Sequence, residues 1–373
     1  MKNILVVLGT RPEAIKLAPV IIELKKSQFF NVVVCNTEQQ KELSNQTLSF
    51  FGLKADINLD VMVDNQTLNQ LQSRLLNKLQ DIYSSQQFDA TIVQGDTMTV
   101  FCAALSSFYN KVPVFHVEAG LRSNNLFEPF PEEAIRQMVS RITDLHFCPT
   151  NNSKKYLEQE SLVNKNFINT GNTVIDALSC IDANVLAKAW ASIKDYGIEL
   201  NKQVVLITVH RRENHGERLK HIINAIIQIS KCFPSIQFVL PVHPNPNVKN
   251  KVHELLCNIN NIFLLPPLPY PELVLLMKNS KLIMTDSGGI QEEAPSFGCP
   301  ILVLRYETER QEGVEAGFAQ LVGSDCNAII KSAKNILENP SAFEKLKKLQ
   351  NPYGDGRAAH KIVHTMKGYF KLK

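Results

Sequence analysis

The sequence predicts an α/β protein with two Rossmann-like, doubly wound domains that face each other across a cleft. The chain has 373 residues, which is longer than a single hydrophobic core usually supports. Short apolar runs alternate with stretches of helical period, which is typical of βα units around a parallel sheet. This alternation begins again in the second half of the chain, and therefore indicates a second sheet.

Four apolar runs in the first half of the chain are predicted to be strands, at residues 4–8, 32–36, 90–93 and 112–115. Apolar side chains with helical spacing follow the first run at residues 14–24, and occur again at residues 101–108. Thr10 and Glu13 have the spacing of a capping box at the start of the first helix. Pro19 is a candidate kink inside that helix.

The second half repeats the pattern, with a predicted helix through residues 219–227 and strands at residues 204–209, 236–240, 282–284 and 301–304. Two βα series in one chain imply two doubly wound domains. We expect the linker between them near residues 170–185.

The charge and hydropathy patterns exclude several classes of protein. Lys and Arg total 40 against 36 acidic residues, a net charge of +4, without the basic block that is typical of nucleic-acid binding. No apolar window approaches the roughly 18 residues of a membrane-spanning helix, and the short N-terminal apolar run lacks the features of a signal peptide. We therefore expect a cytoplasmic protein with no nucleic-acid or membrane partner.

Sequence motifs for metals and nucleotide cofactors are absent. The eight cysteines include no C-x-x-C pair, so structural zinc is not expected. No G-x-G-x-x-G follows the first predicted strand, and there is no P-loop motif. The sequence therefore predicts a reaction without a metal or a cofactor.

Ligands of open α/β sheets bind beyond the carboxyl ends of the strands, so the residues that follow each apolar run are candidates. The motif G-T-R-P-E follows the first run at residues 9–13, and Lys16 lies one helical turn further on. A tight turn, a helix N-terminus and the cations Arg11 and Lys16 indicate an anion site. The alternative is a tight turn with solvated charges.

Carboxylates follow the next two predicted strands of this half. Asp96, in Q-G-D-T, is either a functional acid or a simple helix cap. Glu118, in H-V-E-A-G-L-R, lies where burial would raise its pKa, and the alternative is a surface pair with Arg122. Glu132, in P-F-P-E-E, precedes Arg136, although prolines and acids are also typical of an ordinary helix start.

Two histidines follow predicted strands of the second half. In H-R-R-E-N, a cluster of potential cations favours a phosphate-binding or catalytic role for His210. His243, in P-V-H-P-N-P, is expected to fix its loop.

The strongest single motif of the chain is T-D-S-G-G-I-Q-E-E at residues 285–293. It ends a strand and begins a helix with two glycines, an arrangement that binds a diphosphate. Glu293 could take a ribose diol, and Arg310 is a candidate phosphate ligand. The alternative is a Gly-Gly turn before a helix.

Together with G-N-T-V-I-D and N-P-Y-G-D-G, these motifs run in order over nearly the whole chain. The sequence closely resembles the bacterial non-hydrolysing UDP-N-acetylglucosamine 2-epimerases. This resemblance implies a glycosyltransferase-B fold, a homodimer, and the interconversion of UDP-GlcNAc and UDP-ManNAc for surface polysaccharide. It also implies that a final helix, at residues 355–373, joins the first domain (residues 1–172), and that residues 173–354 form a UDP-binding domain.

The resemblance also assigns residue roles. It implies that the catalytic residues are Asp96, Glu118, Glu132 and His210. The implied UDP contacts are Arg11, Ser287, Gly288, Gly289, Glu293 and Arg310. Further positions that contact the sugar or line the cleft are Lys16, Arg136 and His243.

The sequence departs from the family pattern in two places. Gln40 and Lys41 stand where many members have His and Arg, in a region that helps some members to bind a second, activating UDP-GlcNAc. With Gln46, they are candidate regulatory residues. Leu273 replaces an aromatic residue near the uracil, so it is a candidate UDP contact with different base packing.

The C2 proton of the sugar has no neighbouring carbonyl, so we expect elimination of UDP, a 2-acetamidoglucal intermediate and re-addition. Asp96 is the favoured base, with Glu118 or Glu132 as the opposing acid. The sequence leaves four alternatives open: a glycosyltransferase with an acceptor, a hydrolysing epimerase, an inactive nucleotide-sugar sensor, and an epimerase of a modified UDP-sugar.

Overall fold

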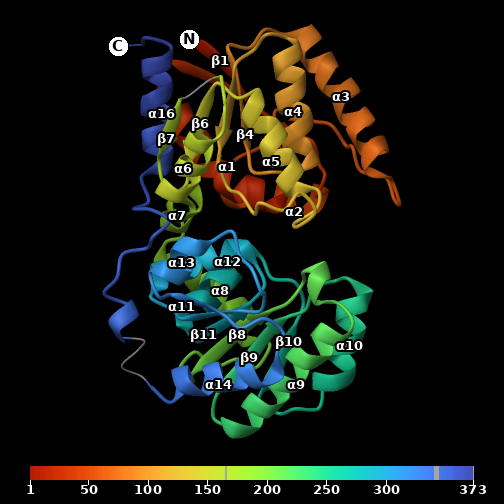
Figure 1. Cartoon of the computed structure of the whole chain (residues 1–373), viewed down its shortest axis with the longest axis vertical. Helices are drawn as coiled ribbons and strands as arrows, with labels where there is room; N and C mark the ends of the chain where they lie inside the picture. Colours follow the sequence, from red (N-terminus) through yellow and green to blue (C-terminus); the bar gives the residue numbers. More distant parts are fainter. Residues whose placement is uncertain (164–165, 340–343, 373) are drawn as a thin grey trace. The chain divides into compact units, whose positions relative to one another are not determined.

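The computed structural model of the chain describes residues 1–163, 166–339 and 344–372. It consists of two compact units (Figure 1): unit 1 contains Met1–Cys180 and Tyr353–Lys373, and unit 2 contains Ile181–Pro352. The sequence placed the boundaries after residues 172 and 354. The structure assigns residues 173–180 to unit 1, because their helix packs against two helices of that unit.

Unit 1 is built on a seven-stranded parallel sheet with the order β3-β2-β1-β4-β5-β6-β7. The chain reverses its direction of strand addition between β1 and β4, which is where open α/β sheets bind ligands. The strands are β1 (Lys2–Leu8), β2 (Phe30–Asn36), β3 (Ile57–Asn58), β4 (Ala90–Gln94), β5 (Val114–Val117), β6 (Leu145–Cys148) and β7 (Phe167–Asn169).

Helices cover both faces of this sheet, because alternate residues of a strand point to opposite faces. Ile4 and Val6 of β1 pack in one core with α1 and α16, whereas Leu5 and Val7 pack in another with α3 and α4. The helices are α1 (Arg11–Lys26), α2 (Lys41–Phe50), α3 (Leu68–Ser85), α4 (Met98–Tyr109), α5 (Glu132–Arg141), α6 (Asn151–Gln159), α7 (Thr173–Ser179) and α16 (Ala358–Tyr369).

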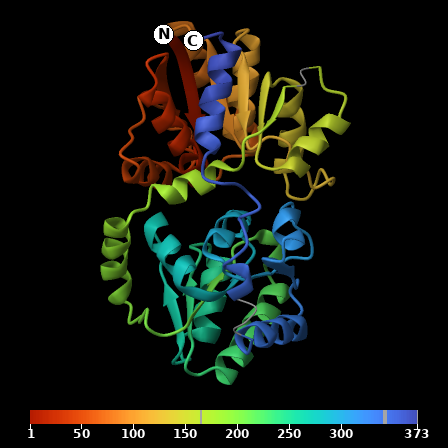
Figure 2. The ribbon, with the colours of Figure 1, turned by 90° about the vertical axis from the view of Figure 1, so that its left-hand side faces the viewer.

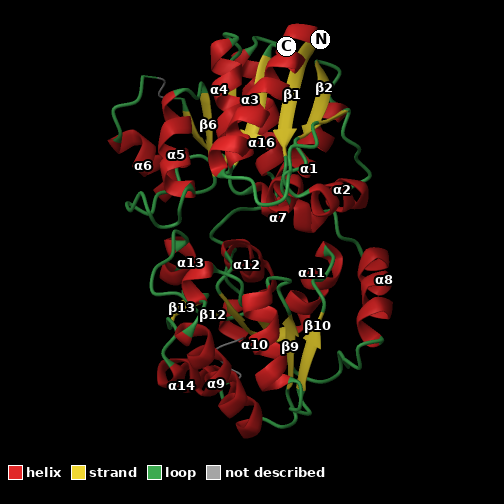
Figure 3. Cartoon of the chain, turned by 90° about the vertical axis from the view of Figure 1, so that its right-hand side faces the viewer, coloured by secondary structure: helices red, strands yellow, loops and turns green. Residues whose placement is uncertain are grey.

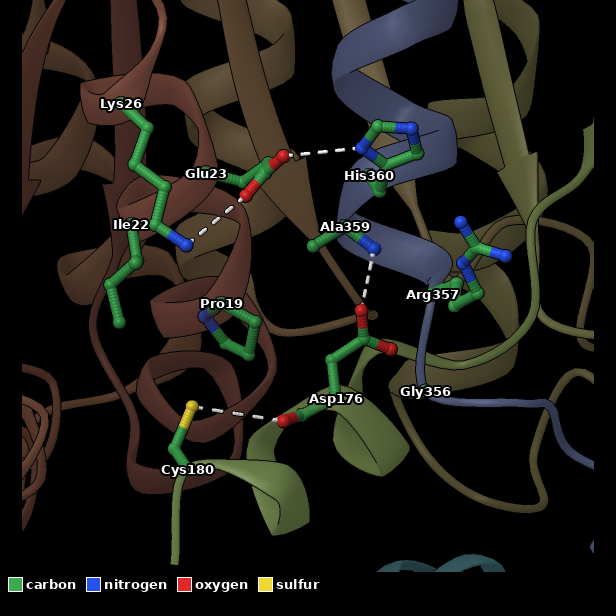
Figure 4. A pocket seen from close by; sticks show the side chains of 10 residues that line it. All are labelled: Pro19, Ile22, Glu23, Lys26, Asp176, Cys180, Gly356, Arg357, Ala359 and His360. Atoms are coloured by element: carbon green, nitrogen blue, oxygen red, sulfur yellow. Dashed lines mark hydrogen bonds and ion pairs between the residues drawn. The ribbon is translucent and has the colours of Figure 1, made fainter.

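The C-terminal helix α16 returns to unit 1 and lies along its sheet near the N-terminal strand (Figure 2). The Asp176 carboxylate of α7 accepts hydrogen bonds from the backbone N–H groups of Ala358 and Ala359, at 3.1 and 2.8 Å. His360 of α16 also contacts Glu23 of α1, with 3.2 Å between Nδ1 and Oε1. Asp176, Ala359, Glu23 and His360 line one pocket, where the contact of Asp176 with Ala359 and that of Glu23 with His360 are both seen (Figure 4).

Unit 2 repeats the architecture with a six-stranded parallel sheet, in the order β10-β9-β8-β11-β12-β13, between layers of helix (Figure 3). Its strands are β8 (Val204–Thr208), β9 (Gln237–Pro241), β10 (Ile262–Leu265), β11 (Ser280–Thr285), β12 (Ile301–Val303) and β13 (Ala319–Leu321). Its α-helices are α8 (Ala183–Lys194), α9 (Glu217–Cys232), α10 (Pro246–Leu256), α11 (Tyr270–Asn279), α12 (Gly288–Glu293), α13 (Gln311–Glu315) and α14 (Cys326–Leu337).

The two doubly wound sheets confirm the predicted α/β class. Helix α1 continues through Pro19, the candidate kink. None of the helices in the described ranges is both long enough and apolar enough to cross a membrane.

Candidate active site

The predicted site residues of unit 1 follow three neighbouring strands. Arg11 and Lys16 lie on α1, which follows β1, whereas Asp96 follows β4 and Glu118 follows β5. Since β1, β4 and β5 are adjacent parallel strands, their carboxyl ends share one edge of the sheet. Glu132 begins α5, which is reached by the loop after Glu118.

Glu118 is held by a buried lysine. Both carboxylate oxygens lie 2.7 Å from the Nζ of Lys16, and the side-chain amide of Gln94 donates a further hydrogen bond. Lys16 and Glu118 are only 6% and 8% exposed, so removing either partner would leave a buried charge. The alternative surface pair with Arg122 is wrong, because the Nε of Arg122 contacts Glu160 at 2.6 Å.

The backbone of Glu118 is in the left-handed region, with φ at 65°. This conformation costs a non-glycine residue about 1–3 kcal/mol and is concentrated at functional sites. A glutamate that is both strained and ion-paired supports a functional role for this position.

Asp96 is fixed by an arginine of α5. Its Oδ2 lies 2.7 Å from the Nε and 2.7 Å from the Nη2 of Arg136. The Nη1 of Arg136 contacts Glu133 at 3.1 Å, and Glu133 also accepts the backbone N–H of Ser123 at 2.9 Å. The interpretation of Asp96 as a helix cap is wrong, because Thr97 is the N-cap of α4. Glu133, which the sequence did not single out, is fully buried and orients Arg136.

The candidate regulatory residues lie on or beside α2. The side-chain carbonyl of Gln40 accepts the backbone N–H of Arg11 at 3.0 Å, so Gln40 helps to shape the turn that carries Arg11. Lys41 pairs with Asp60 at 2.9 Å, and Gln46 is exposed.

Glu13 is a second buried carboxylate that the sequence assigned only to a helix cap. It accepts hydrogen bonds from the backbone N–H groups of Gly9 and Thr10, at 2.7 and 3.0 Å, and from the hydroxyl of Thr97. Burial raises the pKa of Glu13 to about 7, although these hydrogen bonds act in the opposite direction. Glu13 therefore joins the turn after β1 to the turn after β4.

In unit 2, His210 is organised by Asp286, a residue that the sequence did not single out. The Asp286 side chain is fully buried and lies 3.0 Å from the Nδ1 of His210. It also accepts the backbone N–H groups of His210 and Arg211 and the side-chain amide of Asn214. Burial alone would raise the pKa of Asp286, but the His210 contact and these hydrogen bonds hold it below its usual value. The signal for Asp286 was its position directly after a buried strand, in T-D-S-G-G.

His243 fixes its own loop, as predicted. Its Nδ1 accepts the backbone N–H of Asn245 at 3.2 Å, and its ring stacks on that of His210 with 5.9 Å between centroids. Burial and the neighbouring His210 lower the pKa of His243.

The glycine motif of unit 2 packs directly against Arg310. A Cβ added at Gly288 would lie 2.9 Å from the Arg310 Cζ, whereas a Cβ at Gly289 would meet nothing closer than a Glu293 oxygen at 3.8 Å. The Nε of Arg310 contacts Glu292 at 3.0 Å. Gly288 is therefore required for the position of the guanidinium.

Glu293 is the last residue of α12, and two further candidate positions lie near the starts of helices. Ser287 is the N-cap of α12, and Leu273 lies half-buried in the first turn of α11. Within the described ranges, no group of three or more His, Cys, Asp or Glu residues could hold a metal ion.

A family model described as UDP-N-acetylglucosamine 2-epimerase matches residues 22–367. The chain belongs to this family. It is 46% identical to the UDP-N-acetylglucosamine 2-epimerase of Neisseria meningitidis, over 98% of this chain and 99% of that protein. It is 40% identical to the enzyme of the same name from Escherichia coli K12, over 98% of both chains.

Solved epimerase structures have the same fold. The Neisseria meningitidis UDP-GlcNAc 2-epimerase bound to UDP-GlcNAc matches with a TM-score of 0.92 and 45% identity, over 98% of this chain and 100% of that chain. The Methanocaldococcus jannaschii enzyme, in complex with UDP-GlcNAc and UDP, matches with a TM-score of 0.84 and 31% identity, over 98% and 99%. The predicted glycosyltransferase-B fold and the assignment to the epimerases, which are isomerases, are confirmed.

Proposed function

We propose that this epimerase-family protein interconverts UDP-GlcNAc and UDP-ManNAc without hydrolysis. One observation carries the proposal: two carboxylates, Asp96 and Glu118, follow neighbouring strands at one sheet edge, and each is held by its own buried cation. Binding UDP does not require such carboxylates, whereas proton transfer at a sugar carbon does. The relatives that were solved with UDP-GlcNAc support the substrate.

The proposed reaction begins with loss of UDP. The bond between C1 and the diphosphate oxygen breaks, a base takes the C2 proton, and a 2-acetamidoglucal and UDP remain. A proton then returns to C2 from the opposite face, and the diphosphate oxygen bonds to C1 again. The proposed reaction needs no redox cofactor, because the electron pair of the C1–O bond leaves with UDP and forms that bond again when UDP returns.

Unit 1 supplies the acid–base groups in this proposal. The Asp96 side chain is 25% exposed and that of Glu118 is 5% exposed, so Asp96 is the more accessible base. Glu118 or Glu132 donates the proton on the other face. Arg136 holds Asp96 in one orientation, and Lys16 holds Glu118. Both carboxylates are therefore fixed relative to the sugar ring of the substrate.

Unit 2 binds UDP in this proposal. The backbone N–H groups of residues 287–289 and the guanidinium of Arg310 take the diphosphate, and Glu293 takes the ribose. His210 donates from the nitrogen that does not face Asp286, and so stabilises the charge that develops on the leaving diphosphate. The family resemblance implies Arg11 as a further UDP contact.

Proton NMR of UDP-GlcNAc with the protein in D₂O tests the proposal. UDP-ManNAc with deuterium at C2 and no free sugar is the expected result. Free ManNAc would indicate hydrolysis instead. An unchanged, fully protonated substrate would contradict the proposal and favour a modified UDP-sugar, an acceptor-dependent glycosyltransferase or a sensor.

The family resemblance supports a homodimer that works in the cytoplasm and supplies precursors of surface polysaccharide. Sedimentation equilibrium checks the first part of this proposal: twice the 42.0 kDa chain mass is expected, and a monomer at enzyme-assay concentration would contradict it.

A further inference from the structure

We propose that Glu13 and His116 are positioning residues that hold the Asp96 turn, residues 95–97, from its two sides. The turn joins β4 to α4. This inference rests on the proposed function, because it concerns the geometry of the proposed base. His116 contacts the backbone of the turn at Gly95, and Glu13 contacts the hydroxyl of Thr97.

His116 holds the N-terminal side of the turn. Its side chain is 1% exposed on β5, and its Nε2 lies 2.8 Å from the carbonyl oxygen of Gly95. A carbonyl oxygen only accepts, so this nitrogen carries the hydrogen. The N–H of Gly95 donates to the carbonyl of Val117 at 3.1 Å. Both backbone polar groups of Gly95, whose φ is 85°, are therefore satisfied by β5.

Glu13 holds the C-terminal side of the turn. Its carboxylate accepts the hydroxyl hydrogen of Thr97, while the other oxygen accepts the N–H groups of Gly9 and Thr10. The same Thr97 hydroxyl caps α4 by accepting the N–H of Val100. Glu13 is 2% exposed. One buried carboxylate thus couples the start of α4 to the turn that carries Arg11.

The position of Asp96 depends on these two attachments. Its side chain is oriented by Arg136, and the position of its Cα follows the backbone of residues 95 and 97, to which it is bonded. Displacement of a reacting group by about 1 Å costs on the order of 10²-fold in rate. Loss of the His116 attachment should therefore lower kcat while UDP binding stays the same, whereas loss of Glu13 also releases the turn that carries Arg11, an implied UDP contact.

Leucine and glutamine variants at both positions test the inference. His116→Leu and Glu13→Leu should lower kcat by about 10²-fold, and His116→Leu should keep KM and the Kd for UDP within about threefold of the wild-type values. His116→Gln keeps an N–H donor and Glu13→Gln keeps a carbonyl acceptor, so both should recover most of kcat. The matched control is His146→Leu, since His146 is a buried histidine opposite His116 on β6, with its ring packed edge-to-face on Phe167.

Hydrogen exchange, followed by mass spectrometry, reports on the turn independently of activity. Peptides that contain residues 95–100 should exchange faster in the two leucine variants than in the wild type or in His146→Leu. The inference is overturned by unchanged exchange, by a wild-type kcat in the leucine variants, or by an equal loss of kcat in His146→Leu. An inactive wild-type protein would instead contradict the proposed function, and the exchange measurement would still decide the inference.

Discussion

At the level of single residues, Asp96 combines access with a fixed orientation. A quarter of its side chain is exposed, although two nitrogens of the buried Arg136 lie 2.7 Å from its Oδ2. Arg136 is in turn held by the fully buried Glu133. A chain of charged contacts from the core to the sheet edge therefore limits the rotamers that Asp96 can adopt, which is the preorganisation that proton transfer requires.

Asp96→Asn should remove the base and keep the shape of the site. We expect kcat for epimerisation to fall by about 10²–10⁴-fold, with an unchanged Kd for UDP in calorimetry. The control is Asp89→Asn, since Asp89 lies at the opposite end of the same strand, where it pairs with Lys2 at 2.8 Å. Near-normal turnover by Asp96→Asn would remove Asp96 from the mechanism.

Glu13 should make stability depend on pH in an unusual direction. Its folded pKa of about 7 exceeds the usual 4.5, so the folded state binds the proton more tightly. The contribution of Glu13 to the free energy of unfolding is fully present below pH 4.5, decreases as the pH rises towards 7, and is constant above that. The shift corresponds to about 3 kcal/mol. Asp96 faces Glu13 and raises its pKa further, whereas Thr97 lowers it.

Glu13→Gln should abolish this titration and keep the acceptor. The free energy of unfolding of the variant, minus that of the wild type, should increase by about 3 kcal/mol between pH 4.5 and pH 8. Urea denaturation at both pH values measures it. A difference that does not change with pH would show that Glu13 ionises normally.

The sequence named candidate site residues, but it did not predict how they pair. Lys16 and Glu118 were both candidates, but their contact joins positions 102 residues apart and depends on β1, β4 and β5 being neighbours. Asp286 and Glu133 were missed because an acid beside a helix start is also an ordinary cap. Only their complete burial shows that they orient His210 and Arg136.

At the level of elements, the anchoring of α16 depends on one buried carboxylate. Asp176 accepts two N–H groups from the first turn of α16, and these donors would otherwise be unsatisfied at the helix start. Burial raises the pKa of Asp176, but the two hydrogen bonds favour its charged form. The exposed contact between His360 and Glu23 adds little by comparison.

Asp176→Ala should destabilise unit 1 by about 1–3 kcal/mol, because it leaves buried donors unpaired. The expected result is a lower thermal midpoint and faster proteolysis near residue 357. Glu23→Gln, which alters the exposed contacts of Glu23 with His360 and Lys26 in the same pocket (Figure 4), should change the midpoint much less. Equal effects of the two variants would contradict this assignment.

Strands were predictable where both faces are buried. Every residue of β4 is buried, and so are four of the five residues of β8, so β4 is mainly apolar and β8 is apolar from Val204 to Ile207. In contrast, β3 at the sheet edge has two residues, Ile57 and Asn58, and β7 has only partly buried or exposed residues. Such short edge strands are defined by the pairing of their backbone with a neighbouring strand. This pairing produces no apolar pattern in the sequence.

At the level of the whole molecule, the proposed function divides its tasks between two units. The return of α16 to unit 1 was expected only from the family resemblance, because a contact between residues 23 and 360 has no local signal. With that helix in place, unit 1 holds the proposed acid–base groups and unit 2 holds the glycine motif and Arg310. Binding and chemistry should therefore be separable by substitution.

Gly288→Ala should impair the binding of UDP. The new Cβ would lie 2.9 Å from the Arg310 Cζ, so the guanidinium must move away from its present position. We expect the Kd for UDP to rise about tenfold, which corresponds to about 1.4 kcal/mol. Gly368→Ala, where an added Cβ meets nothing within 4 Å, serves as the control and should bind UDP normally.

The double variant Asp96→Asn/Gly288→Ala measures whether the two tasks are independent. In the proposed function, Asp96 acts in proton transfer, whereas Gly288 acts through the position of Arg310. Their losses in kcat/KM should therefore multiply, so that the free-energy changes add to within about 0.5 kcal/mol. A double variant no worse than Asp96→Asn alone would mean that the position of Arg310 matters only when the base is present. UDP binding and proton transfer would then be one coupled step, and the division of tasks between the units would be wrong.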